Sequence, residues 1–168
     1  MDNGLFVARV VLGGLMAAHG AQKLFGWFGG YGLAGTAGFM EALGFRPGRL
    51  FASLASAGEI AGGLLVAAGL FGPIGPAIML SVMIVAAVSV HWEHGVFAAG
   101  NGIELPLLYA SGAAALVLTG PGRYSLDQWL GVGSIWTPGL EWLALGIGVA
   151  GAVASLAMRR MPPRAATV

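Results

Sequence analysis

The stretch LFASLASAGEIAGGLLVAAGL at residues 50–70 decides the class of fold, because it is apolar throughout except for Glu59 and a few small polar residues. A helix needs about 20 predominantly apolar residues to cross the hydrocarbon core of a bilayer. The stretch therefore predicts a transmembrane helix with one ionisable side chain in its middle. Small residues surround Glu59, and in membranes such residues allow neighbouring helices to approach closely.

The composition of the whole chain agrees with a membrane protein. Of its 168 residues, 57% are hydrophobic and 9% are charged, and the mean hydropathy is +0.83. Ordinary soluble domains have about 25% charged residues, so lipid is the expected solvent for most of this surface. The chain has no cysteine, which excludes disulfides, thiol redox catalysis, iron–sulfur clusters and Cys-type zinc sites. A net charge of +1 gives no nucleic-acid-binding footprint.

Four further windows have the length and hydropathy of spanning helices, at residues 4–25, 74–90, 103–119 and 140–158. We expect an all-α integral membrane protein. Residues 1–130 would form a four-helix transmembrane bundle, and residues 131–168 would add a fifth transmembrane helix and a basic tail. A short amphipathic helix is also expected in the long connection after the first span.

The distribution of Lys and Arg predicts the orientation of the five spans. Six of these residues lie at the end of the first span, in the connection after it, or after the last span: Lys23, Arg46, Arg49, Arg159, Arg160 and Arg164. Two lie toward the opposite side: Arg9 and Arg123. Cytoplasmic loops of membrane proteins have an excess of Lys and Arg. We expect a multi-pass protein of the cell membrane with its N-terminus outside and its C-terminus in the cytoplasm.

On this topology, polar side chains converge on the cytoplasmic half of the bundle. They are His19, Gln22, Lys23, Glu59, His91, Glu93, His94 and Glu104. Ionisable groups inside a bilayer are costly unless they are paired or hydrated, so each is a candidate for a functional site. Glu59 is the sharpest candidate, with Lys23 or His19 as its counter-charge. The same Glu59–Lys23 contact would also serve as a structural ion pair that fixes helix register.

A second polar group is expected in the outer half. Arg9 is placed at the level of Asp127 and Glu141, where it would form a structural clamp or bind an anionic ligand. Residues 122–127 predict a turn into a short interfacial helix with Ser125 as its N-cap, so Arg123 and Asp127 are given structural roles. His19 and His91 could ligate haem or a metal only if the fold brought them together, and no two histidines have a close helical spacing. No metal site is therefore predicted.

Four motifs in order resemble the DoxX family of small bacterial membrane proteins. They are Arg9 with HGAQKLFG at residues 19–26, GEIAGG at 58–63, GIE at 102–104 and LTGPGRYSLD at 118–127. The resemblance covers about residues 9–127. It implies a four-helix membrane bundle, and the helix at residues 140–158 departs from that pattern.

The resemblance implies a role in membrane redox chemistry. DoxX-like proteins are linked to a subunit of thiosulfate:quinone oxidoreductase and to membrane complexes that handle thiol or oxidative stress. The sequence has no redox centre of its own. The resemblance therefore implies an oxidoreductase subunit that uses a lipid quinone. Glu59 and His19 would then be catalytic, and the ligand-binding residues would be Lys23, Gln22, His91, Glu104 and Arg9. Phe25, Trp27 and Phe28 would flank the quinone ring.

Two other functions are compatible with the same residues. One is a non-enzymatic small-solute carrier, and the other is a membrane scaffold that anchors soluble redox enzymes. Besides the lipid bilayer, the expected partners are such enzymes or further copies of the chain.

Overall fold

The computed structural model describes residues 2–160 and is built entirely from helices within that range. The helices are α1 (Asp2–Phe25), α2 (Gly32–Ala42), α3 (Gly48–Ala68), α4 (Ile74–Ala86), α5 (Glu104–Thr119), α6 (Leu126–Leu130) and α7 (Pro138–Ala157). The all-α prediction is confirmed. Arg164, part of the predicted basic tail, lies outside the described residues.

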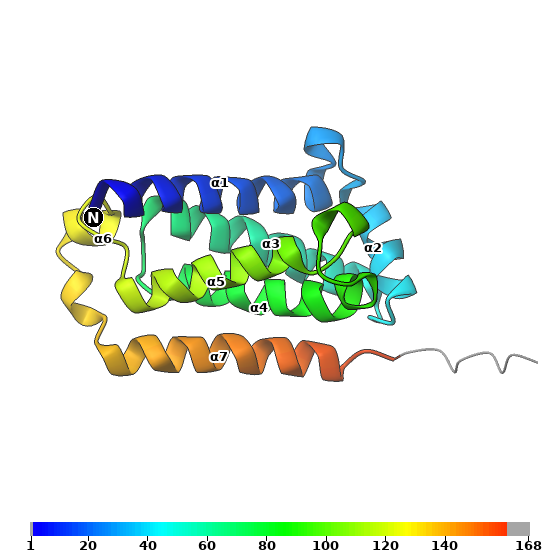
Figure 1. Ribbon diagram of the computed structural model, residues 1–168. Helices are drawn as coiled ribbons and strands as arrows, with labels where there is room; N and C mark the ends of the chain where they lie inside the picture. Colours follow the sequence, from blue (N-terminus) through cyan, green and yellow to red (C-terminus); the bar gives the residue numbers. More distant parts are fainter. Residues whose placement is uncertain (1, 161–168) are drawn as a thin grey trace, which may run out of the picture.

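Five long helices, α1, α3, α4, α5 and α7, lie side by side, and the short α2 and α6 cap opposite ends (Figure 1). We call these the α2 end and the α6 end. α3 and α4 lie in the middle of the assembly: α3 packs against α1, and α4 packs against α5 and α7. The predicted amphipathic helix in the first long connection corresponds to α2.

Four of these helices are long and apolar enough to cross a membrane: α1, α3, α4 with the turns that continue it to His94, and α7. α5 has 16 residues, which at 1.5 Å per residue gives about 24 Å, less than the roughly 30 Å of a hydrocarbon core. The chain is thus a membrane protein in which the C-terminal helix is a span candidate in its own right. Of the five predicted spans, the one at residues 103–119 is the one whose helix falls below spanning length.

Glycine lets α1 and α3 pack with their backbones in contact. A Cβ atom added at Gly13 would lie 2.4 Å from the carbonyl oxygen of Gly63, and one added at Gly63 would lie 2.5 Å from the carbonyl oxygen of Gly13. Further toward the α2 end, a Cβ atom at Gly20 would lie 2.7 Å from the carbonyl oxygen of Ser56. Any larger residue at these positions would separate the two helices, which is the reason for small residues at membrane helix interfaces.

The GxxxG pair of α3, Gly58 and Gly62, faces α4 and not α1. A Cβ atom at Gly62 would lie 3.2 Å from the carbonyl oxygen of Gly75, and one at Gly58 would lie 3.2 Å from a methyl group of Val82. The motif therefore brings a helix close, as predicted. The charged partner of Glu59 comes from the other neighbour, α1.

Candidate functional site

Glu59 is held inside the bundle on α3, where it is 1% exposed. It lies eleven residues after Gly48, or about 16 Å along the helix axis. Its carboxylate oxygen Oε1 accepts a hydrogen bond from the Lys23 ammonium, and the two side chains form a salt bridge. The structure thus pairs Glu59 with Lys23, one of the two counter-charges that the sequence offered.

The close packing of α1 on α3 positions this ion pair. Gly20 lies against the backbone of Ser56 one turn before Lys23, so α1 approaches α3 closely where the pair forms. The carbonyl oxygen of Lys23 also accepts a hydrogen bond from the Thr36 hydroxyl at 3.1 Å, which ties the end of α1 to α2. Lys23 is therefore fixed at both its backbone and its ammonium group.

The second carboxylate oxygen of Glu59 is buried and has no hydrogen-bond partner within the described part of the chain. An unsatisfied buried acceptor costs about 1–3 kcal/mol, more when it is charged. Tyr109 of α5 is half-buried and near enough to Glu59 to interact with it electrostatically. This carboxylate therefore has an unused hydrogen-bonding position.

His19 extends the group through Tyr109. The two rings meet edge to face, with their centroids 6.2 Å apart. The Gln22 amide nitrogen donates to the carbonyl oxygen of Phe28 at 3.1 Å, so the amide oxygen faces His19 Nδ1, also at 3.1 Å. In a neutral ring the proton then belongs on Nδ1, because only a donor can satisfy that oxygen, and Nε2 is left as an acceptor.

We call Lys23, Glu59, Tyr109 and His19 the inner cluster. Glu59 is sealed, but the rest is open to the outside of the bundle: the Lys23 side chain is 33% exposed and His19 is exposed. A ligand in the membrane or at its surface would therefore meet His19 and Lys23 first. Proton exchange with Glu59 would pass through Lys23, to which it is hydrogen-bonded.

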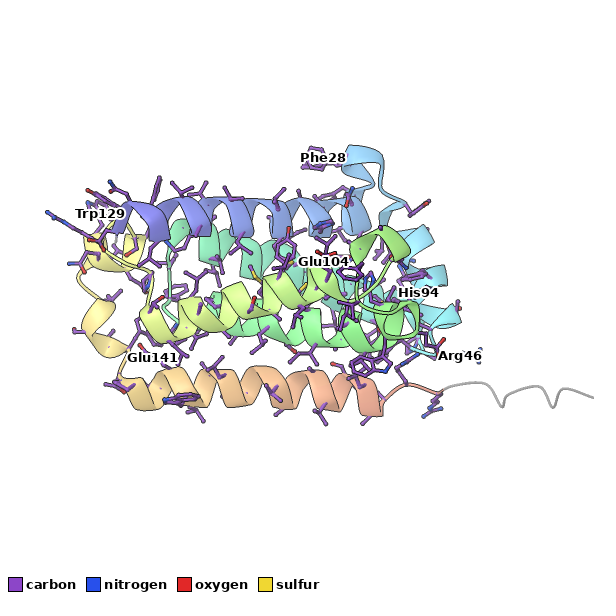
Figure 2. The ribbon with its side chains drawn as sticks, viewed as in Figure 1. Phe28, Arg46, His94, Glu104, Trp129 and Glu141 are labelled. Carbon is purple, nitrogen blue, oxygen red and sulfur yellow. The ribbon has the colours of Figure 1, made fainter. Side chains whose placement is uncertain are left out.

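The other predicted members of the inner site lie in the connection between α4 and α5, with Glu104 and His94 toward the α2 end in Figure 2. His91 Nδ1 donates to the carbonyl oxygen of Asn101 at 2.7 Å, and the Ala98 amide donates to Glu104 Oε2 at 2.7 Å. These side chains hold their own loop in shape. Glu93 and His94 are exposed, and His94 donates back to the carbonyl oxygen of Val90.

The aromatic residues expected to flank a quinone ring have exposed side chains. Phe25, Trp27 and Phe28 are 56%, 59% and 71% exposed and contact one another. Figure 2 shows Phe28 beyond the end of α1, on the outside of the bundle. Exposed aromatic residues, tryptophan above all, are common at membrane–water interfaces.

A second buried polar cluster lies at the α6 end. Arg9 is 2% exposed and donates to the carbonyl oxygens of Tyr124 and Val66. Asp127 is fully buried and accepts hydrogen bonds from the backbone amides of Phe71 and Gly72, at 2.8 and 2.6 Å.

Trp136 completes this cluster, since its indole nitrogen donates to Asp127 at 3.0 Å. The opposite charges of Arg9 and Asp127 attract each other, but the two side chains do not form a salt bridge. Carbonyl groups accept from the two terminal nitrogens of Arg9, whereas its Nε is buried without a hydrogen-bond partner in the described part of the chain, and Asp127 accepts from two amide groups and an indole.

The remaining predicted residues have simpler places. Ser125 accepts the hydrogen bond from the Gln128 amide at 3.3 Å, which confirms the predicted N-cap of α6. Arg123 is exposed, and its backbone amide donates to Asp2. Glu141 lies in the first turn of α7 (Figure 2). The described residues contain no group of three or more His, Asp or Glu side chains that could hold a metal ion.

Comparison with known protein families gives one match. A sequence model of the DoxX family matches residues 4–92. The chain belongs to the DoxX family. Comparison with curated proteins and with solved structures found no match.

The DoxX match covers α1 to α4, and with them Arg9, His19, Lys23 and Glu59. Tyr109 and the Asp127 cluster follow the matched region. Tyr109 is the member of the inner cluster that sequence reasoning missed. The available signal was a lone phenol in the middle of an apolar segment, a place where a buried tyrosine needs a hydrogen-bond partner.

Proposed function

We propose that this DoxX protein is a membrane-embedded subunit of a redox system and binds a lipid quinone at the inner cluster. The observation that carries the proposal is the sealed Glu59 carboxylate, which is paired with Lys23 and has one unused oxygen. A buried ionisable group in a membrane helix is by default a functional site. Here it lies under a surface that presents an imidazole acceptor and an ammonium group to the membrane.

Reduction of a bound quinone requires side chains that donate protons to it. Reduction of a quinone to a quinol takes two electrons and two protons, one proton for each carbonyl oxygen. A side chain that transfers a proton must lie within hydrogen-bond reach of the acceptor. Lys23 and His19 are open to a ligand, and the Glu59 carboxylate holds the Lys23 ammonium group in place. The electrons come from a partner protein, since the chain has no cysteine.

The proposal also includes the topology and the domain division. Residues 1–130 form the DoxX-like bundle with four spans, and α7 adds a fifth. The α2 end, with Lys23, Arg46, Arg49, Arg159 and Arg160, faces the cytoplasm of a cell-membrane protein. A soluble enzyme that supplies electrons would meet the inner cluster from this side.

The test is binding of decylubiquinone, a short-chain quinone, to the purified full-length protein, followed by quenching of tryptophan fluorescence. We expect Glu59→Gln, which removes the charge that holds the Lys23 ammonium group in place, and His19→Phe, which removes the imidazole, each to raise the dissociation constant about tenfold. Glu141→Gln is the matched control at the α6 end and should bind as the unchanged chain does. Unchanged quinone binding by Glu59→Gln would refute the proposal.

One observation favours a second candidate, a scaffold whose ion pair only fixes helix register. Lys23 and Glu59 join the two helices that glycine packs most closely. In a pure scaffold, variants of the pair would change stability and leave any quinone affinity unchanged. The binding measurement therefore separates the two candidates when it is combined with a stability measurement on the same variants.

A further inference from the structure

A long apolar groove lies on the opposite side of α3 from the ion pair. Its volume is about 480 Å³. α4 forms its floor from Ile74 to Val85, α3 and α7 form its walls, and Met40 and Phe45 close it at the α2 end. The eleven steps along α4 from Ile74 to Val85 correspond to about 16 Å at 1.5 Å per residue.

The shape and lining of the groove fit a hydrocarbon chain. Its walls and floor are made of aliphatic and aromatic side chains, and Ser81 and Ser155 supply the only side-chain hydroxyl groups among the lining residues. All three helices that form it are long and apolar enough to cross a membrane. A groove of this size in a bilayer is filled by lipid, because an empty one would lose its dispersion contacts.

Charge at the closed end indicates which lipid. Phe45 lies next to Arg46 in sequence, and the Arg159 guanidinium lies over the Phe45 ring, 5.5 Å from its centroid. The Arg160 amide donates to the carbonyl oxygen of Gly44 at 2.8 Å, which brings α7 and its basic end to the same place. Arg46 and Arg160 are exposed, and Figure 2 shows Arg46 next to the end of α7.

One acidic residue lies near this basic group. Glu41, on α2, accepts a hydrogen bond from the Gly48 amide at 3.1 Å. The side chains around the closed end therefore have an excess of positive charge. Basic pockets between transmembrane helices bind anionic lipid head groups.

We propose that the groove is a binding site for an anionic phospholipid, with one acyl chain along α4 and the phosphate at Arg46 and Arg160. The site does not overlap the inner cluster: Gly58 lines the groove, whereas the neighbouring Glu59 points to α1. The bound lipid would fill the space between α3 and α7, which both pack against α4 but have few contacts with each other. This inference does not depend on quinone binding.

The experiment uses the full-length protein in mild detergent, titrated with dioleoyl phosphatidylglycerol or dioleoyl phosphatidylcholine and analysed by native mass spectrometry. The two lipids have the same chains, so only the head group differs. We expect phosphatidylglycerol to bind about tenfold more tightly, and the double variant Arg46→Gln/Arg160→Gln to lose that preference. Arg123→Gln, which removes an exposed charge at the α6 end, should keep it.

A second pair of variants tests the groove itself. Gly151 lines the groove, and Gly146 lies on the same helix outside it. Gly151→Leu should weaken binding of both lipids at least fivefold, whereas Gly146→Leu should not. Equal affinity for the two lipids, an equal effect of Arg123→Gln, or unchanged binding by Gly151→Leu would overturn the proposal. Displacement of phosphatidylglycerol by decylubiquinone would also overturn it, because the groove would then hold the quinone.

Discussion

Glu59 and Lys23 differ in how deeply the protein buries their side chains. Glu59 is 1% exposed, and the Lys23 side chain is 33% exposed. Burial of both charges would raise the cost of removing the pair from water. The asymmetry leaves the ammonium group in reach of a ligand while it still neutralises the carboxylate. The same two residues are therefore suited both to stabilise the fold and to take part in proton transfer.

This pairing leads to a prediction about stability. Lys23→Met removes the partner of a buried carboxylate and should lower the free energy of unfolding by about 3–5 kcal/mol. The double variant Lys23→Met/Glu59→Gln removes both charges and should recover most of that loss. Reversible unfolding in mixed micelles, followed by circular dichroism, measures both. A double variant no more stable than Lys23→Met would contradict the assignment of the cost to an unpaired Glu59.

Asp127 gives a second prediction at the scale of the residue. It accepts three hydrogen bonds, from the amides of Phe71 and Gly72 and from the Trp136 indole. Asp127→Asn replaces one acceptor oxygen by a donor that faces other donors, so we expect a loss of about 2–3 kcal/mol. The same unfolding measurement tests it, with the exposed Gln128→Glu as a control. A loss below about 0.5 kcal/mol would show that these bonds contribute little.

At the scale of the element, the contact between α1 and α3 determines where the inner cluster lies. The backbones touch at Gly13 and Gly63, and the ion pair forms further along the same interface. A shift of either helix would part Lys23 from Glu59. Glycine at this interface is thus connected to the chemistry of the site.

Gly13→Ala tests this connection. Its Cβ atom would lie 2.4–2.5 Å from backbone atoms of Gly63 and Ala67, so we expect destabilisation of about 1–3 kcal/mol from overpacking. Gly14→Ala is the matched control, since nothing lies within 4 Å of its Cβ atom. Thermal unfolding in detergent should show a lower Tm for Gly13→Ala and an unchanged Tm for Gly14→Ala. Equal values would mean that the helices separate without cost.

Sequence reasoning predicted the elements better than the site. The helices follow from runs of apolar residues, and the need to pair Glu59 follows from the cost of a buried charge. Depth along a helix, however, gives no information about which face a side chain occupies. His91 and Glu104 lie toward the α2 end, as the sequence indicated. Both side chains, however, form hydrogen bonds with the backbone of the α4–α5 connection and not with the inner cluster. A π-helical turn at Ala87–His91 also changes the rotation of that segment, and no residue pattern predicts it.

At the scale of the whole molecule, the open question is whether α5 crosses the membrane. Its length of about 24 Å is short for a span, yet α5 packs against α4 and α7 and contributes Tyr109 to the inner cluster. Short spans are accommodated when the bilayer thins or when flanking residues reach the interface. If α5 crosses, the α4–α5 loop and the α6 region lie on opposite sides of the membrane. If it does not, they lie on the same side.

The absence of native cysteine allows a direct measurement of this topology. We propose the single variants Glu93→Cys, at the α2 end, and Ser134→Cys, beyond α6; both positions are exposed. If the α2 end faces the cytoplasm and α5 crosses, as proposed above, a membrane-impermeant maleimide added to intact cells should label Ser134→Cys only, and permeabilised cells should label both. Labelling of Glu93→Cys alone would reverse the orientation. Identical labelling of the two variants in intact cells would show that α5 does not cross, which would place the redox partner and the α6 region on one side.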